Sequence, residues 1–345
     1  MSISIIIPTY NRACQLSRTL DSIKKLNTNP NEFEIIIVDN ASKDNTKQIV
    51  DQFINKNKKN TTRYFFDDIP GLLSGRHRGA KEANGDVLIF IDDDVRVHRN
   101  WLNNIKETFN KYSEVGIVGG KCLPLYENTP PEWLKYFWRY ISKDEKVLPE
   151  LSLCDYGEKE KKISPKWVWG LNFSIRKETF RKLGGFNPDC IPHEYQYFQG
   201  DGETGLSIKA IECGCEAMYQ PNAIVYHEVP SSRMTIEYFD KRYFYSGICN
   251  SYTKIRHNHG IKSHILLIEK FIALKGKLYQ TLIQFLKQKS KVSFEQEMLF
   301  ARFNCMENAG YEYHQKMARS FPVILDWILK EDYLNYDFRK LLKKM

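Results

Sequence analysis

The sequence predicts an α/β fold with a doubly wound, mainly parallel sheet and a helical region at the C-terminal end. Within the first 120 residues, short apolar runs alternate with segments whose apolar residues recur at helical spacing. Polar sequences directly follow three of these runs, and the pattern turns helical after about residue 252. Because alternating strands and helices are typical of parallel sheets covered on both faces, these observations favour one doubly wound sheet.

Each expected element has its own local signal. The Ile-rich run at 2–8 indicates a buried strand, and the segment after it carries Leu16, Leu20 and Ile23 at helical spacing. An Asn-Gly pair at 84–85 separates the third expected helix from the next strand. We expect strands at 2–8, 33–38, 63–66, 87–91, 115–118, 167–173 and 223–226, helices at 13–26, 43–55, 74–83 and 101–112, and a loop-dominated insertion at 125–165.

Three polar sequences stand where expected strands end, namely PTYNR at 8–12, DNAS at 39–42 and DDD at 92–94. The ligands of doubly wound sheets bind beyond the carboxyl ends of the strands. The topology alone therefore predicts that these three sequences meet in one binding site.

The usual glycine-rich phosphate cradles are missing from this sequence. A dinucleotide fold needs G-x-G-x-x-G after its first strand, but no glycine precedes Gly71. A P-loop needs G-x-x-x-x-G-K followed by Ser or Thr, and GIVGGKC at 116–122 has the wrong spacing and a cysteine in the last position. We therefore expect a diphosphate at this site to be held by a metal ion and by side chains.

The three aspartates at 92–94 follow directly on an apolar run. Because alternate side chains of a strand share a face, Asp92 should pair with Asp94 while Asp93 turns away. Carboxylate oxygens select hard cations such as Mg²⁺ or Mn²⁺, and Mg²⁺ typically uses one or two carboxylates together with substrate phosphates. The alternative is a solvated acidic turn before the helix at 101–112.

Most of the net charge of +9 lies in the last quarter of the chain, where 16 Lys/Arg face 9 Asp/Glu from residue 256 onward. No nucleic-acid-binding motif accompanies this basic end, so we expect no nucleic-acid partner. A lysine-interrupted apolar face at 265–291 suggests peripheral contact with an anionic membrane, with a packed helical subdomain or a dimer contact as the alternative. Without a signal peptide or a membrane-spanning stretch, we expect a cytoplasmic protein, with the inner face of the membrane as the place of any such contact.

Four blocks of sequence resemble the family 2 glycosyltransferases, which have the GT-A fold. They are IIIPTYNR at 5–12, IIIVDNAS at 35–42, GLLSGRHRGAKEANGDVLIFIDDDV at 71–95 and GLNFSIRKETFRKLGGFNP at 170–188. The likeness covers roughly residues 1–230, and the blocks are specific in combination. We expect a catalytic domain at 1–254, with a nucleotide-binding half at 1–120 and an acceptor and catalytic-base half at 121–254, and a helical C-terminal region at 255–345.

The resemblance also implies roles for individual residues. Asp94 matches the position of the D-x-D motif that binds the metal, and His227 would be a further metal ligand or a diphosphate contact. Trp169 and Asn172 would contact the donor or acceptor sugar. Helix capping, core packing or simple solvation is the alternative for these positions and for the nucleotide contacts. The nucleotide contacts that the resemblance implies are Pro8, Thr9, Tyr10, Asp39, Arg76, Asp92 and Asp93.

Inverting transfer needs a carboxylate that takes the proton of the acceptor hydroxyl. In the family this base lies in an E-D-x-[DE]-L segment at the start of a helix, and QGDGETGLSIK at 199–209 departs from that pattern. Matching the downstream apolar and basic positions places Glu203 on the base, whereas matching the first acid places Asp201 there. We favour Glu203 and expect both residues in the same site.

The resemblance implies an inverting, metal-dependent transfer of a sugar from a nucleotide diphosphate donor of the UDP or dTDP type. The acceptor would be a hydroxyl of a glycan or lipid-linked molecule in the synthesis of cell-surface polysaccharide, glycolipid or a related glycan, and the cofactor would be Mn²⁺ or Mg²⁺. A sugar-phosphate nucleotidyltransferase is one alternative. A catalytically inactive scaffold of the same fold is another, suggested by the departure from E-D-x-[DE]-L. The oligomeric state is left open.

Overall fold

The computed structural model describes residues 1–58, 61–261 and 294–343, which fall into two compact units. The first unit consists of residues 1–238 and 330–345, and the second of residues 239–329. The expected boundary between residues 254 and 255 lies inside helix α7 (Ile236–His257). The apolar face predicted at 265–291 lies outside the described residues.

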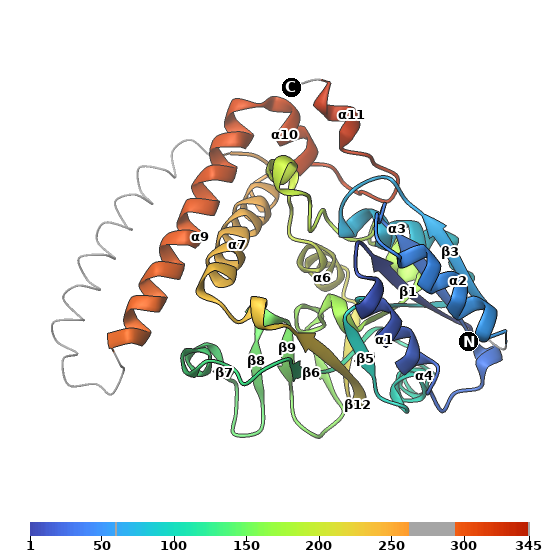
Figure 1. The fold of residues 1–345 in the computed structure, drawn as a ribbon. Helices are drawn as coiled ribbons and strands as arrows, with labels where there is room; N and C mark the ends of the chain where they lie inside the picture. Colours follow the sequence, from blue (N-terminus) through green and yellow to red (C-terminus); the bar gives the residue numbers. More distant parts are fainter. Residues whose placement is uncertain (59–60, 262–293, 344–345) are drawn as a thin grey trace. The chain divides into compact units, whose positions relative to one another are not determined.

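One sheet of twelve strands forms the centre of the first unit (Figure 1). Its order is β3-β2-β1-β4-β11-β6-β9-β8-β7, with β12 beside β6. Strands β3, β2, β1 and β4 are parallel neighbours, which agrees with the predicted alternation, while β11 runs antiparallel between β4 and β6. The strands are β1 (Ile3–Thr9), β2 (Phe33–Asp39), β3 (Thr61–Phe66), β4 (Val87–Phe90), β5 (Val95–Val97), β6 (Val115–Tyr126), β7 (Arg139–Tyr140), β8 (Lys146–Leu148), β9 (Leu153–Asp155), β10 (Lys161–Ile163), β11 (Phe173–Arg176) and β12 (Glu216–Val229).

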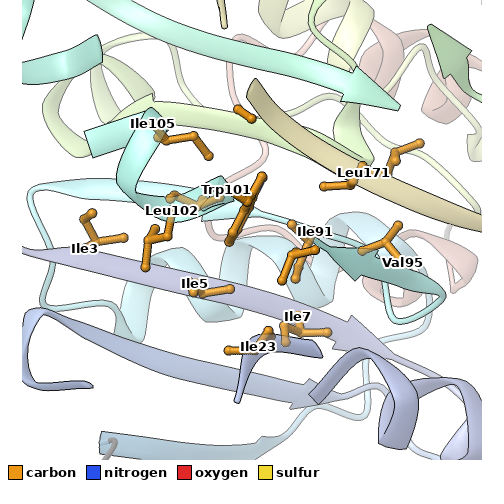
Figure 2. Packing of buried hydrophobic residues seen from close by; sticks show 14 of the residues in the cluster. Ile3, Ile5, Ile7, Ile23, Ile91, Val95, Trp101, Leu102, Ile105 and Leu171 are labelled. Atoms are coloured by element: carbon orange, nitrogen blue, oxygen red, sulfur yellow. The ribbon is translucent and has the colours of Figure 1, made fainter. Parts of the chain in front are cut away.

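Helices cover both faces of this sheet, as the alternation of side chains along β1 requires. Ile5 and Ile7 pack in one core cluster with Trp101 and Leu102 (Figure 2). Ile6 points the other way, where a Cβ added at Gly79 of α3 would collide with its side chain. The helices of the first unit are α1 (Ala13–Ile23), α2 (Thr46–Lys56), α3 (Leu72–Glu82), α4 (Trp101–Lys111), α5 (Lys177–Lys182), α6 (Glu203–Glu212) and α11 (Arg339–Leu342).

Three expected strands differ from the observed ones. The strand predicted at 167–173 is mostly two 3-10 turns, at 165–167 and 170–172, and β11 begins only at Phe173. The strand predicted at 115–118 is the beginning of the much longer β6, and the one predicted at 223–226 is an inner part of the much longer β12. Polar residues and glycines interrupt the apolar signal there. One of these glycines is needed for the pairing, because a Cβ added at Gly120 would collide with the carbonyl oxygen of Ala223.

The described part of the second unit consists of helices. Residues 239–257 of α7 pack closely against α9 (Phe294–Ser320), and α10 (Pro322–Ile328) follows. The close approach needs glycine on both helices, because a Cβ at Gly247 or Gly310 would collide with backbone of the other helix. Among the residues that the structure describes, we find no helix with the length and apolar character that crossing a membrane requires.

A buried histidine binds the C-terminal segment of the first unit to helix α3. Nδ1 of His77, on α3, donates to the carbonyl oxygen of Tyr333 at 3.1 Å, while Nε2 accepts from the N–H of Phe186 at 3.0 Å. Burial lowers the pKa of His77 to about 3, and the positive charges of Lys209 and Arg76 act in the same direction. The imidazole is therefore neutral in the folded protein at neutral pH.

We predict that acid destabilises the protein through His77. The histidine of the unfolded chain takes up a proton near pH 6.5, whereas the folded protein does so only near pH 3. Between these values the free energy of unfolding should fall by up to about 1.4 kcal/mol per pH unit for this group. His77→Gln should lower stability at pH 7 but lose less between pH 7 and pH 5, as measured by urea unfolding. His257→Gln, at an exposed position, should keep the wild-type slope. Equal slopes for His77→Gln and wild type would contradict the prediction.

Candidate active site

The three polar sequences at the strand ends come together in the structure, as the topology predicted. The Thr9 hydroxyl, at the end of β1, donates to Asp93 Oδ2 at 2.7 Å. The backbone N–H of Asn11 donates to the Ser42 hydroxyl at 2.9 Å, which joins the loops after β1 and β2. Asn11 has a positive φ of 52°, a conformation that asparagine tolerates better than most residues, and this turn leads into Arg12.

Arg12 lies between two of the aspartates and was not recognised in the sequence. Its Nη1 is 2.9 Å from Asp93 Oδ1 and 3.0 Å from Asp94 Oδ2. Both carboxylates are buried, with exposed fractions of 3% and 5%. A buried carboxylate without a partner is costly, so one guanidinium shared by two adjacent carboxylates is a strong local constraint.

Asp94 has a second pair of partners, His227 on β12 and Arg233 beyond it. Arg233 Nη2 donates to Asp94 Oδ2 at 2.8 Å, and its Nη1 lies 2.8 Å from His227 Nε2. Because a guanidinium can only donate, Nε2 must be the accepting nitrogen, and Nδ1 then donates to the carbonyl oxygen of Leu151 at 2.9 Å. This assigns a neutral tautomer to His227, with its lone pair on the side of Asp94.

Asp93 and Asp94 are expected to titrate very differently. Burial and the neighbouring charge of Asp94 raise the pKa of Asp93 and outweigh the attraction of Arg12. Burial also disfavours the charged form of Asp94, but the charges of Arg233 and Arg12 outweigh it and hold its pKa well below the usual range. Asp94 is therefore the carboxylate that keeps its negative charge.

The predicted pairing of Asp92 with Asp94 is wrong. Strand β4 ends at Phe90, so the triplet lies in a turn and does not follow strand alternation. Asp93 does not turn away, since it is buried beside Asp94 and bound to the same arginine. Asp92 points to a different partner, Arg76, whose Nη2 donates to Asp92 Oδ1 at 3.0 Å.

Arg76, on α3, connects the aspartate triplet to the candidate base. It is buried, with 3% of its surface exposed, and its Nη1 lies 3.7 Å from Glu203 Oε2. The guanidinium packs over the ring of Phe186 at 5.2 Å. Its space depends on Gly170, because a Cβ there would lie 2.6 Å from Nη2. A buried cation therefore stands between Asp92 and Glu203.

Glu203 and Asp201 lie in one site, as expected, but in different surroundings. Glu203 is the first residue of α6, and its side chain is 30% exposed. Burial is the main cause that raises its pKa, with the charge of Asp189 adding to it and that of Arg76 opposing it. Asp201 is more deeply buried and accepts from Asn187 Nδ2 at 2.8 Å.

The other expected nucleotide contacts line the ends of β1 and β2. Asp39 is buried, and its two oxygens accept from the Ser42 N–H and from the Tyr64 hydroxyl, both at 2.8 Å. Tyr64 was not recognised in the sequence. Tyr10 is 55% exposed, so its ring has an open face, and Pro8 packs against α3 at Gly75.

The structure does not support a sugar contact for Asn172. It is buried, and its Oδ1 accepts from Trp101 Nε1 at 2.9 Å. Its Nδ2 donates to the carbonyl oxygens of Lys121 and Ala223 at 3.3 and 2.9 Å. The amide is therefore engaged in holding β6, β12 and α4 together. Trp169 packs against the hydrophobic core, which was the alternative considered for it.

The residues around Asp94 fit a divalent cation. Asp94 Oδ1 is buried without a hydrogen-bond partner among the described residues, and it lies 3.5 Å from His227 Nε2. Carboxylate oxygen and imidazole nitrogen both suit Mn²⁺. No group of three or more His, Cys, Asp or Glu residues suited to a metal occurs in the described ranges 1–58, 61–261 and 294–343. The chain thus offers two ligands, and a bound diphosphate and water would supply the others.

The fold and this strand-edge site define the class of protein as a GT-A type α/β protein. The mannosyltransferase PcManGT from Pyrobaculum calidifontis, solved with GDP-Man and Mn²⁺, shares the fold with a TM-score of 0.54 and 18% identity, over 95% of this chain and 84% of that chain. Residues 4–122 match the family described as glycosyl transferase family 2.

Curated relatives are glycosyltransferases of moderate similarity. A validoxylamine A glucosyltransferase from Streptomyces hygroscopicus subsp. limoneus is 26% identical over 202 residues, which is 54% of this chain and 44% of the relative. A glucosyl-dolichyl phosphate glucuronosyltransferase from Haloferax volcanii is 23% identical over 252 residues, or 72% of this chain and 75% of the relative. The chain thus spans about half the length of the Streptomyces relative.

We predict that Asn172→Leu destabilises the protein without weakening nucleotide binding. Leucine has a similar volume but leaves Trp101 Nε1 and two carbonyl oxygens without their partner, which should cost about 1–3 kcal/mol in the free energy of unfolding. Asn222→Leu, at an exposed position, is the matched control and should change stability little. Chemical denaturation and calorimetric titration with a UDP sugar would measure the two effects. Unchanged stability together with weaker ligand binding would instead support the sugar contact.

Proposed function

We propose that this protein transfers a glycosyl group from a nucleotide diphosphate sugar to an acceptor hydroxyl, with inversion at the anomeric carbon. The observation that carries the proposal is the position of Arg76 between Asp92 and Glu203. This contact joins the aspartate triplet, beside which the donor diphosphate would bind, to a carboxylate whose pKa is raised. A general base needs a carboxylate whose pKa is shifted toward the working pH.

Glu203 acts as the general base in this proposal. It accepts the proton of the acceptor hydroxyl while the hydroxyl oxygen forms a bond to the anomeric carbon and the bond from that carbon to the diphosphate oxygen breaks. Asp201 is less suited to this role because one of its oxygens is occupied by Asn187. We assign Asp201 to the support of the loop before α6.

Arg233 and Arg12 face the negative charge that develops on the leaving diphosphate. Both lie against Asp94, and fixed positive groups at the position of developing charge lower the barrier of such reactions. A divalent cation, when bound by Asp94 and His227, would neutralise further charge on the diphosphate. Mn²⁺ and Mg²⁺ are the cations we propose.

The donor and acceptor follow from the resemblance and the relatives. We propose a pyrimidine nucleotide, with the Tyr10 ring against the base and Asp39 near the base or ribose, in agreement with the open face of Tyr10. The acceptor would be a hydroxyl of a glycan or lipid-linked molecule, as expected for cell-surface polysaccharide or glycolipid synthesis. Cytoplasmic location and peripheral membrane contact belong to the same proposal.

We predict that Glu203→Gln lowers kcat by about 10²–10⁴-fold, because the amide cannot take the proton. The Kd for UDP, measured by calorimetry, should stay within about threefold of the wild-type value. Glu212→Gln, at the exposed end of the same helix, is the matched control and should keep full activity. Asp201→Asn should lose less than Glu203→Gln. The reverse order of the two losses would assign the base to Asp201.

We predict that Asp94→Asn weakens Mn²⁺ binding at least about tenfold, because it removes the charged ligand of the pair. Mn²⁺ electron paramagnetic resonance in the presence of UDP measures this without relying on turnover. His227→Ala should weaken binding in the same direction, and turnover should require the metal in wild type. Asp144→Asn, an exposed aspartate, is the control. Equal Mn²⁺ affinity in Asp94→Asn and wild type would remove the metal role.

A further inference from the structure

A basic pocket lies between α1 and the segment around β5, the strand that follows the aspartates. It has a volume of about 360 Å³, and we define it by the six lining residues that have an acidic, basic or imidazole side chain. These are Arg18, Asp21 and Lys25 at the α1 end of the pocket and Arg96, His98 and Arg99 on and after β5. Neither the sequence motifs nor the proposed chemistry uses this pocket.

Many of the hydrogen-bond donors in the basic pocket have no protein partner among the residues that the structure describes. Arg18 binds Glu228 through Nε and Nη2, and Arg96 binds the same carboxylate through Nε at 2.8 Å. Nη1 of Arg18 and both Nη atoms of Arg96 make no hydrogen bond within the described ranges 1–58, 61–261 and 294–343. In the same described ranges, the side chains of Lys25 and Arg99 have no hydrogen-bond or ion-pair partner.

The charges of the pocket do not cancel. Four cationic side chains, Arg18, Lys25, Arg96 and Arg99, face Asp21 and the adjacent Glu228, which leaves a surplus of two positive charges. Glu228 holds the two guanidinium groups near each other, although like charges repel. A phosphate group carries about one to two negative charges and several acceptor oxygens, and it matches guanidinium donors well.

The pocket and the aspartates share one framework. Strand β5 begins directly after Asp94, and the N–H of Glu228 donates to the carbonyl oxygen of Asp94 at 2.9 Å. The Thr19 hydroxyl, on α1 one residue after Arg18, donates to the carbonyl oxygen of Asp93 at 2.8 Å. At roughly 3.3 Å per residue, β5 carries the chain from Asp94 to the far end of the strand in roughly 10 Å. The end of β5 that lines the pocket therefore lies roughly 10 Å along the chain from Asp94.

We propose that the basic pocket binds a phosphate group, as a phosphomonoester or phosphodiester, carried by the acceptor. The proposal rests on the proposed glycosyl transfer and adds the chemical class of the acceptor to it. A concave pocket fits a single small group that makes defined hydrogen bonds. A flat anionic membrane surface would instead contact a flat, exposed basic patch. The pocket would fix the acceptor while Glu203 acts on its hydroxyl.

The test compares Lys25→Ala/Arg99→Ala with Lys24→Ala/Lys143→Ala. The first pair removes two lining cations that have no ion-pair partner in the described part of the chain, and the second removes the same charge at exposed positions outside the pocket. The probe is glycerol 1-phosphate, titrated calorimetrically at low ionic strength. We expect its Kd to rise at least about tenfold in the pocket variant and to stay within about twofold in the control. Equal affinity in both variants, or no binding to wild type, would overturn the proposal.

Two further measurements distinguish an acceptor phosphate from a membrane surface and test the nucleotide-sugar chemistry separately. Flotation with phosphatidylglycerol and phosphatidylcholine vesicles tests whether the pocket binds a membrane surface. Flotation that depends on the pocket, without glycerol phosphate binding, would overturn an acceptor phosphate as the occupant.

Titration with UDP and Mn²⁺ tests the proposed function by itself. Wild type that binds glycerol phosphate through the pocket but fails to bind UDP contradicts the nucleotide-sugar chemistry alone. An unchanged Kd for UDP in the pocket variant, with weaker glycerol phosphate binding, supports the assignment.

Discussion

The shared ion pair of Arg12 with Asp93 and Asp94 is the interaction on which the site depends. Adjacent carboxylates repel each other, and burial adds a large desolvation cost, so they stay together only if a cation in direct contact compensates them. Arg12 does so at 2.9 and 3.0 Å. Because it comes from the turn after β1 and the aspartates from the turn after β4, the ion pair also fixes the distance between these two strand ends. The same principle recurs at Asp92, where Arg76 is the compensating group.

Each cation at the triplet comes from a different part of the chain, so the aspartates are connected both to the candidate base and to the candidate metal ligands. Arg76 belongs to α3 and reaches toward the candidate base, whereas Arg233 follows β12 and binds both Asp94 and His227. The lone pair of His227 Nε2 that accepts from Arg233 is the one a metal ion would need. A metal and the Arg233 hydrogen bond are therefore alternatives at this nitrogen, and metal binding would release Arg233 to face phosphate.

The sequence allowed the sheet and the strand-edge site to be predicted because both follow from local patterns. Ile-rich runs between amphipathic segments indicate parallel strands, and polar residues after them indicate a ligand edge. Arg12 and Arg233 were missed because an arginine in a turn carries no periodic signal, and only tertiary contacts give it a partner. The alternation argument for the triplet failed because β4 ends at Phe90, two residues before Asp92. Asn172 was predicted to contact a sugar because the sequence alone does not show whether an asparagine side chain is buried.

The choice between Glu203 and Asp201 depends on where α6 begins. Glu203 is its first residue, so its side chain lies near the positive end of the helix, which favours a charged carboxylate. Burial and the charge of Asp189 act against that, and the net effect raises the pKa. Arg76 limits the rise and keeps the charged form accessible. Asp201, just before the helix, is tied to Asn187 and supports the loop. In the proposed mechanism, the departure from E-D-x-[DE]-L thus changes which residue supports the base, while the carboxylate at the start of the helix stays beside its arginine.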